Sequence, residues 1–284
     1  MAKSIFGLQL SNDTVELFRA WGSELSAQIG TILTRVPQTN DIDWVTVNLP
    51  SSGSYGGSEV YRFNDTSQST APIFIKFEYG RVSTANVQIR ATVGKTQDGD
   101  GGIGEQLLSP TVTLAGVAAG TIENSYVSGG SSWFALSLAP AAASRGGFFV
   151  VERAVTSGGM PYPAAVLLGW QLSSPDQQQW RFVDYIATTS ESVAGGIVAI
   201  PLPLTSDRSI ANGTTAPIFP AACISPAGVF WRPRVILGTA RQNAGLGEVV
   251  SGLLDGNTYL SLGGGSQGSD QRSSPFATTL IRWD

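Results

Sequence analysis

Carboxylates that could act as an acid–base pair are the first candidates for chemistry in this chain. Four of them lie in the second half of the sequence, and these are Glu152, Asp176, Asp184 and Glu191. A glycoside hydrolase needs two such groups at a defined separation across the scissile bond. No spacing among the four singles out two of them. We therefore expect no catalytic residues and no enzymatic activity.

The residues that most often bind metals or act as nucleophiles are nearly absent. The chain has no histidine, and Cys223 is its only cysteine. This excludes disulfides within the chain, zinc sites built from His and Cys, and catalytic pairs in which His is the base. Cys223 lies among apolar residues, a setting typical of a buried and inert thiol.

Asp98 and Asp100 stand two residues apart in a glycine-rich stretch, residues 96–102. A calcium loop of the EF-hand type needs further oxygen ligands and a closing Glu. Neither follows here at the required spacing. The pattern therefore favours a plain hairpin turn, and we expect no metal and no cofactor.

The composition indicates a β-rich protein with many turns. Of the 284 residues only 13% are charged, 42% are hydrophobic, and 34 are glycine. Enough apolar residues are present for a core, so disorder is not expected. A net charge of −4 argues against nucleic-acid binding. No apolar run is long enough to span a membrane or to serve as a signal peptide, so we expect synthesis in a cytoplasm and no membrane insertion.

One segment near the N-terminus reads as an amphipathic helix of roughly 20 residues. The residues from Asn12 to Thr14 offer an N-cap, and Pro37 ends the pattern. Apolar side chains recur at spacings of three and four, namely Leu17, Phe18, Trp21, Leu25, Ile29, Ile32 and Leu33. Two interpretations are open. Either the helix lies across a β-sheet, or its stripe contacts other copies of the chain, with Phe18, Trp21, Leu25 and Ile29 as the assembly interface.

Three consecutive runs, residues 60–63, 72–79 and 87–93, predict a β-meander. Apolar and polar residues alternate in the second and third runs, which is the pattern of half-buried antiparallel strands. Ile73, Ile75, Phe77 and Tyr79 share one side of the second run. The opposite face carries Lys76, Glu78 and Arg90, which could form cross-strand charge pairs.

Further runs predict strands at 42–47, 111–114, 133–138, 148–155, 164–171, 179–186, 196–202, 228–238, 248–253, 258–262 and 278–283. This spacing predicts a mainly β fold, with one or more antiparallel β-sandwiches and one N-terminal amphipathic helix. A small-residue stretch, residues 139–147, offers the best internal boundary. The expected organisation is an N-terminal helix over residues 1–40, a β domain over 41–145 and a second β domain over 146–284.

Six stretches spread along nearly the whole chain carry a resemblance. They are LFRAW at 17–21, YRFNDT at 61–66, APIFIKFEYG at 71–80, TVGKT at 92–96, FVVER at 149–153 and TLIRWD at 279–284. Together they resemble a group of tailed-bacteriophage virion proteins. The resemblance implies a structural component of the virion, in the tail, baseplate or neck. It also implies that other virion proteins are partners and that three or six copies assemble. It identifies no active site.

The alternative function is a host-surface glycan-binding module of the tail. In that case loop tyrosines such as Tyr55, Tyr126 and Tyr162 would contact sugars. Tryptophans can also form sugar-binding platforms, but those of this chain lie in apolar runs, where core packing is expected. They are Trp133, Trp170, Trp180, Trp231 and Trp283.

Overall fold

The computed structural model describes residues 2–9, 13–83, 86–109, 111–114, 122–138, 147–155, 161–171, 178–185, 190–192, 218–220, 223–224, 230–231, 237–239, 249–251, 258–261 and 278–283. The described part consists mainly of antiparallel β-strands, with one α-helix. This confirms the predicted fold class.

The first large sheet, sheet A, brings together the start and the middle of the chain. Its seven strands lie in the spatial order β1 (Ala2–Gln9), β8 (Ile122–Gly130), β9 (Trp133–Leu138), β10 (Gly147–Val155), β11 (Pro161–Gln171), β12 (Gln178–Asp184) and β13 (Ser190–Ser192). All of its neighbouring strands are antiparallel. The strand β1 therefore forms one edge of the sheet, more than a hundred residues away in sequence from its neighbour β8.

The second large sheet, sheet B, contains the predicted meander. Its strands lie in the order β2 (Thr34–Val36), β3 (Ser54–Arg62), β4 (Phe74–Ser83), β5 (Asn86–Gln97) and β6 (Ile103–Leu108), and β7 (Thr111–Leu114) pairs with β5 beside β6. A short 3-10 helix, η1 (Thr66–Ser69), joins β3 to β4.

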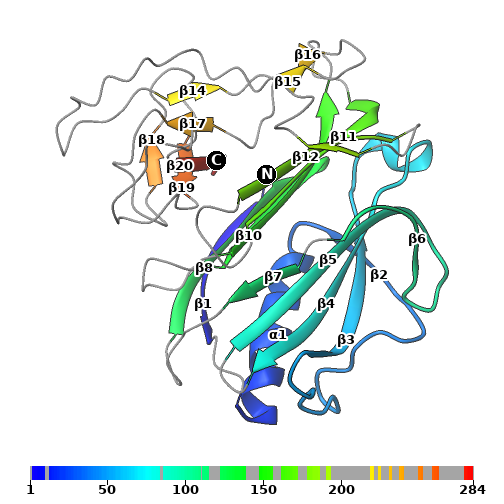
Figure 1. The fold of residues 1–284 in the computed structure, drawn as a ribbon, viewed down its shortest axis with the longest axis vertical. Helices are drawn as coiled ribbons and strands as arrows, with labels where there is room; N and C mark the ends of the chain where they lie inside the picture. The colour runs from blue at the N-terminus through cyan, green and yellow to red at the C-terminus, as the bar shows by residue number, and fades with distance from the viewer. Residues whose placement is uncertain are drawn as a thin grey trace.

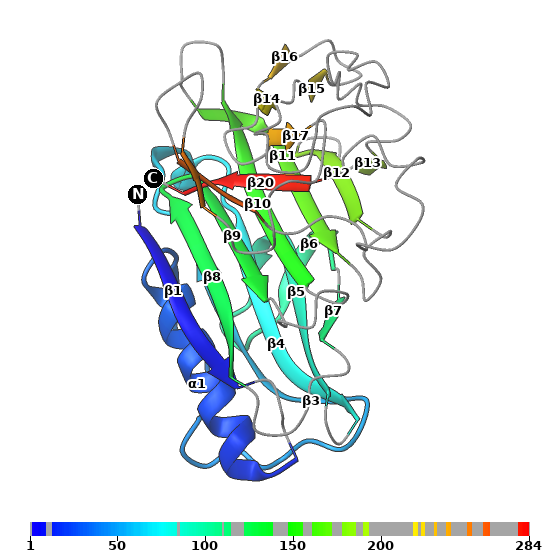
Figure 2. The same ribbon diagram turned by 90° about the vertical axis from the view of Figure 1, so that its left-hand side faces the viewer.

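The two sheets pack face to face, and the helix α1 (Val15–Gly30) closes the space between them on the side of β1 (Figures 1 and 2). Phe77 of sheet B contacts Phe134 and Phe149 of sheet A, with ring centroids 5.8 Å apart in both pairs. The core contains side chains from α1 and from both sheets. The result is a β-sandwich with a helix in its core.

The C-terminal strands form smaller sheets on the other side of sheet A from sheet B (Figure 1). One has the order β14 (Ile218–Pro220), β17 (Leu237–Thr239), β20 (Thr278–Arg282), β19 (Thr258–Ser261) and β18 (Val249–Ser251); the other pairs β15 (Cys223–Ile224) with β16 (Phe230–Trp231). Trp283 packs edge-on against Tyr126 of β8, with ring centroids 6.1 Å apart. This contact joins the C-terminal sheet to the outer face of sheet A.

The predicted boundary between residues 145 and 146 does not separate two domains. Strands β9 and β10 lie on either side of it, and they pair along their length from Gly147 with Leu138 to Glu152 with Trp133. A backbone ladder between them places both in one sheet. Nor do residues 1–40 form a separate unit, since β1 belongs to sheet A and α1 to the core.

The meander prediction is confirmed in detail. Ile73, Ile75, Phe77 and Tyr79 are all fully buried, as are Val87 and Val93 on the next strand. On the outer face, Arg90 lies opposite Glu78 in the register of β4 and β5, and its Nε and Nη2 atoms both donate to that carboxylate. Lys76 lies 3.7 Å from the same group. The alternating pattern thus identified both the buried and the charged face.

A strand predicted over residues 42–47 is wrong. The segment forms a turn in which the Asp43 carboxylate accepts hydrogen bonds from the backbone N–H of Val45 at 2.9 Å and the hydroxyl of Thr46 at 2.8 Å. Asp side chains often stabilise turns this way, in competition with strand pairing. The predicted strand at 196–202 lies outside the described residues.

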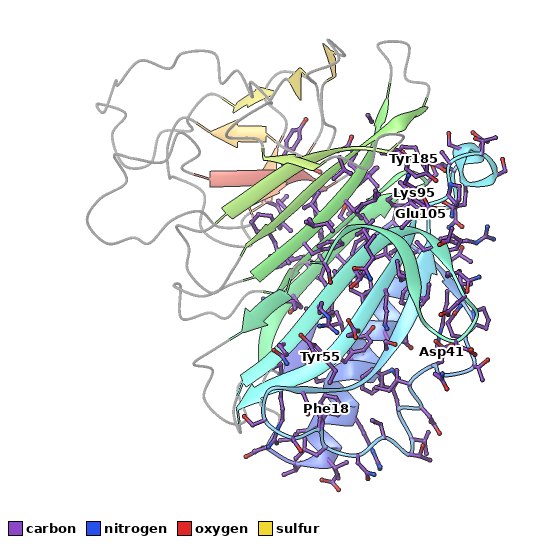
Figure 3. The ribbon with its side chains drawn as sticks, turned by 45° about the vertical axis from the view of Figure 1, so that its right-hand side comes forward. Phe18, Asp41, Tyr55, Lys95, Glu105 and Tyr185 are labelled. Atoms are coloured by element: carbon purple, nitrogen blue, oxygen red, sulfur yellow. The ribbon has the colours of Figure 1, made fainter. Side chains whose placement is uncertain are left out.

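Three contacts, made by Arg153 and Tyr185, help to join the two sheets. The buried Arg153 of β10 donates from Nε to Asp65, which precedes η1, at 2.6 Å. Tyr185, just after β12, donates to the carbonyl of Pro72 at 2.9 Å. Its ring lies 4.7 Å from the Lys95 ammonium of β5 (Figure 3). None of these pairs was expected from the sequence.

Candidate functional site

The expected assembly residues lie on α1, which begins and ends close to the predicted positions. Thr14 is the N-cap, and its side chain accepts a hydrogen bond from the backbone N–H of Leu17 at 3.3 Å. The apolar stripe, however, faces the sandwich. Phe18, Leu25 and Ile29 are 0% exposed and Trp21 is 1% exposed. In the folded chain these four side chains are not available to a second copy, so the expectation of an interface there is corrected. The helix lies across the sheet, which was the other interpretation.

An aromatic cluster holds the first half of the helix in place. Trp21 packs edge-on against Tyr79 with ring centroids 5.8 Å apart, and Trp44 packs on the same tyrosine at 4.9 Å. Phe18 lies 5.8 Å from Trp44 (Figure 3 labels Phe18). The turn that forms in place of the predicted strand therefore places Trp44 against the helix. Gly22 has no side chain, and this leaves space for the Trp44 ring.

We expect the Gly22→Ala variant to be less stable than the wild type by about 1–3 kcal/mol. An added Cβ would lie 1.9 Å from the Trp44 ring, and this overlap outweighs the gain in helix propensity of about 1 kcal/mol. Gly30→Ala on the same helix is the matched control, because nothing lies within 4 Å of its added Cβ. Urea unfolding of both variants checks the prediction; an equal response of the two would contradict it.

A buried carboxylate, Glu59 of β3, fastens the second half of the helix to sheet B. Its side chain is 0% exposed. Four groups contact it, and they are the Ser26 hydroxyl of α1 at 2.8 Å, the Tyr61 hydroxyl of β3 at 2.9 Å, the Tyr79 hydroxyl of β4 at 2.8 Å and the Arg35 guanidinium of β2 at 3.1 Å. The three hydroxyls and the cation satisfy the carboxylate. We call this set the Glu59 network. It holds three strands and the helix together.

Sequence patterns did not reveal the Glu59 network. Glu59 stands within the run SEVYRF, where a charged residue beside apolar ones reads as part of a solvated strand face. Three of its four partners come from positions 26, 35 and 79, so only the folded chain brings the set together. The burial and the full set of partners are typical of a structural network.

Two tyrosines of the Glu59 network have pKa values raised above the usual value. Burial, together with the nearby Glu59 charge, raises the pKa of Tyr61; burial, with Tyr61 and Glu59 nearby, also raises the pKa of Tyr79. A raised pKa means that the neutral phenol is favoured in the folded state. This contribution to stability is complete below the unfolded tyrosine pKa of about 10 and is lost as pH rises beyond it.

We therefore expect the free energy of unfolding to fall between about pH 10 and pH 12. Urea unfolding over this range, with tyrosinate absorbance recorded in parallel, measures the effect. The Tyr61→Phe variant should show a shallower decline, and Tyr55→Phe serves as the control because Tyr55 lies outside the network. Identical slopes for wild type and Tyr61→Phe would contradict the prediction.

The tyrosines considered for glycan contact have different surroundings. Tyr126 is only 7% exposed and packs on Trp283, so it is not a loop residue open to sugars, and that expectation is corrected. Tyr55 is half-buried on β3, and the Arg90 guanidinium lies 4.5 Å from its ring centroid (Figure 3 labels Tyr55). Tyr162 belongs to β11, but its side chain lies outside the described set.

The tryptophans expected in strands all lie in or beside strands. Trp133 is 2% exposed and Trp283 is 5% exposed, which confirms core packing for these two. Trp170, Trp180 and Trp231 belong to β11, β12 and β16, and their side chains are not described.

The acidic glycine stretch forms the expected hairpin turn between β5 and β6. Asp98 accepts hydrogen bonds from the backbone N–H groups of Asp100 and Gly102, both at 2.8 Å. These hydrogen bonds hold the pKa of Asp98 below its usual range. The turn also docks on the segment after β2, where Thr39 donates to the Gly99 carbonyl at 2.8 Å. Among the described residues no group of three or more His, Cys, Asp or Glu side chains could hold a metal.

Three of the four carboxylates considered for catalysis lie on strands of sheet A. Glu152 of β10 is 1% exposed. Asp184 ends β12 and Glu191 lies in β13, with their side chains outside the description; Asp176 is wholly outside it. Cys223 begins β15, and its side chain is also undescribed.

The β1 edge of sheet A carries an exposed apolar side chain. β1 pairs with β8 on one side, and no described strand pairs with its other side. Ile5 on this strand is 53% exposed, while its neighbour Phe6 is buried. Sequence reasoning missed this strand, because its polar residues Lys3, Ser4 and Gln9 do not alternate with the apolar ones.

Comparison of the sequence with family models and with curated proteins gives no match. No helix in the described part of the chain is long and apolar enough to cross a membrane.

Proposed function

We propose that the chain is a non-enzymatic structural component of a bacteriophage particle, in the tail, baseplate or neck, that assembles with its own copies and with other virion proteins. The resemblance over six stretches supports the class. The observation that carries assembly is the outer edge of β1, with which no strand in the described part of the chain pairs, since an unpaired strand edge is a ready template for pairing with another chain.

In this proposal the helix has a supporting role. Its apolar stripe is used within the chain, and the Glu59 network and the aromatic cluster hold it against sheet B. The helix also contacts β1. The outer strand of sheet A is therefore supported by a helix that is itself held in place. A preorganised edge loses less conformational entropy on assembly than a flexible one.

Mass spectrometry of purified particles of the phage that encodes the chain tests the proposal. We expect the chain in the particle at a fixed copy number, with three or six copies per ring. Immunogold labelling should place it at the tail or neck. Its absence from purified particles would contradict the proposed function.

A host-surface glycan-binding module is the second candidate, and one residue favours it. Tyr55 lies on the outer face of sheet B beside Arg90 and Glu78, a combination of aromatic ring, cation and carboxylate that suits sugar hydroxyls. Binding to a glycan array that is lost in Tyr55→Ala would support this function. An array without signal would argue against it.

A further inference from the structure

The outermost strand of sheet A has a long side with which no strand in the described part of the chain pairs. Figure 2 shows β1 at the edge of the sheet, with no described strand beyond it. The strand has eight residues and pairs with β8 without a register shift, from Ala2 with Gly129 to Gln9 with Ile122. The backbone groups that alternate away from β8 are therefore presented in a regular row.

The strand β1 itself has few of the features that usually prevent pairing with another chain. Natural edge strands are protected by proline, by bulges or by charged side chains, above all lysine. β1 has no proline and no bulge. Its one lysine, Lys3, lies with its ammonium 5.7 Å from the Trp283 ring centroid, so the charge is directed onto the C-terminal sheet. Ile5 is left 53% exposed between Lys3 and Gly7.

A second copy of the same strand can pair antiparallel with this edge, and a pairing centred on Ile5 keeps the exposed and buried faces of both copies aligned. Residues directly opposite each other in an antiparallel pair point to the same face. When Ile5 of one copy lies opposite Ile5 of the other, Lys3 lies opposite Gly7, and Ser4 lies opposite Phe6. The exposed and buried faces then continue across both copies. The two lysines are kept apart, which avoids a like-charge pair.

We propose that β1 pairs antiparallel with β1 of a second copy around a two-fold axis at Ile5, which joins the two A sheets into one continuous sheet. The pairing buries the exposed Ile5 side chains against each other and uses the unpaired backbone groups of both strands. The inference rests on the proposed function in that it specifies the self-association proposed there. It requires copies related in pairs by two-fold axes, as in a dimer or a hexamer with dihedral symmetry, and excludes a trimer or a simple six-membered ring built through this edge alone.

Light scattering of the purified full chain over a range of concentrations gives the first test. We expect an even-numbered oligomer for the wild type and association weakened at least about tenfold in Ile5→Lys. Val45→Lys is the matched control, because Val45 is 78% exposed in a turn away from sheet A. Thermal melting followed by circular dichroism establishes that both variants are folded. A monomeric or trimeric wild type, or equal association of the two variants, would overturn the inference.

Cross-linking tests the register. In a Cys223→Ser background, which removes the only native thiol, Ile5→Cys should form dimers with a short bismaleimide, and Val45→Cys should not. Equal cross-linking at the two positions would overturn the pairing. The particle composition is measured separately: a chain found in particles without an Ile5 contact would overturn this inference alone, whereas absence from particles would overturn the proposed function.

Discussion

Replacing Glu59 by Ala is expected to lower the free energy of unfolding by about 3–5 kcal/mol. The substitution removes the acceptor of three hydroxyl groups, those of Ser26, Tyr61 and Tyr79. Buried donors that lose their partner cost about 1–3 kcal/mol each. It also leaves the Arg35 guanidinium without its fully buried partner, although Arg35 keeps a second contact with Asp41 at 3.3 Å.

Glu59→Gln is the control for the loss of charge at nearly constant volume. An amide oxygen still accepts from the tyrosines, so we expect a smaller loss of about 1–3 kcal/mol. Urea unfolding monitored by tryptophan fluorescence measures both variants. Stability of Glu59→Ala within about 1 kcal/mol of the wild type would show that the network does not hold the helix to the sheet.

Replacing Trp21 by Ala is expected to cost about 3–5 kcal/mol of stability, because it opens a cavity in the core. Trp21 is 1% exposed and lies between Phe18 and Tyr79, with ring centroids 5.9 Å and 5.8 Å away. The same reasoning applies to Leu25, which is fully buried. Polar substitutions at these positions should therefore destabilise the fold itself, in contrast to the selective loss of oligomers expected for a stripe exposed to other copies.

Ala20→Ser on the exposed face of the same helix is the matched control for Trp21→Ala, with an expected change within about 0.5 kcal/mol. Chemical unfolding and light scattering are measured together on each variant. A Trp21→Ala protein of unchanged stability that no longer forms oligomers would restore the helix stripe as an assembly interface and contradict the structure-based prediction.

Local patterns were informative wherever one face of an element is buried over its whole length. The alternation from Ile73 to Tyr79 predicted the strand, its buried face and an opposite face where charged side chains could pair, because a period of two admits one arrangement of faces. The helix stripe from Phe18 to Ile29 was recognised for the same reason. The surface that the stripe packs against was left open, since a hydrophobic stripe does not reveal whether its own sheet or another chain covers it.

Non-local pairing accounts for what sequence reasoning missed. β1 is a strand because β8 lies beside it, and β8 comes more than a hundred residues later in the chain. The domain boundary predicted at residue 145 was wrong for the same reason, because β9 and β10, which lie on either side of it, pair in one sheet. In the segment 42–47, an apolar run was mistaken for a strand, whereas the Asp43 side chain stabilises a turn.

The sequence by itself determined the fold class, the meander with its two faces, the helix with its N-cap, and the hairpin turn at Asp98. These depend on neighbours within about ten residues, whose spacing directly sets which side chains share a face. Only the tertiary structure decided that the helix stripe is core, that Glu59 is a buried acceptor for side chains of distant segments, and that β1 is the outermost described strand of sheet A with Ile5 exposed. Each depends on groups from distant segments, and burial or pairing is a property of the packed chain as a whole.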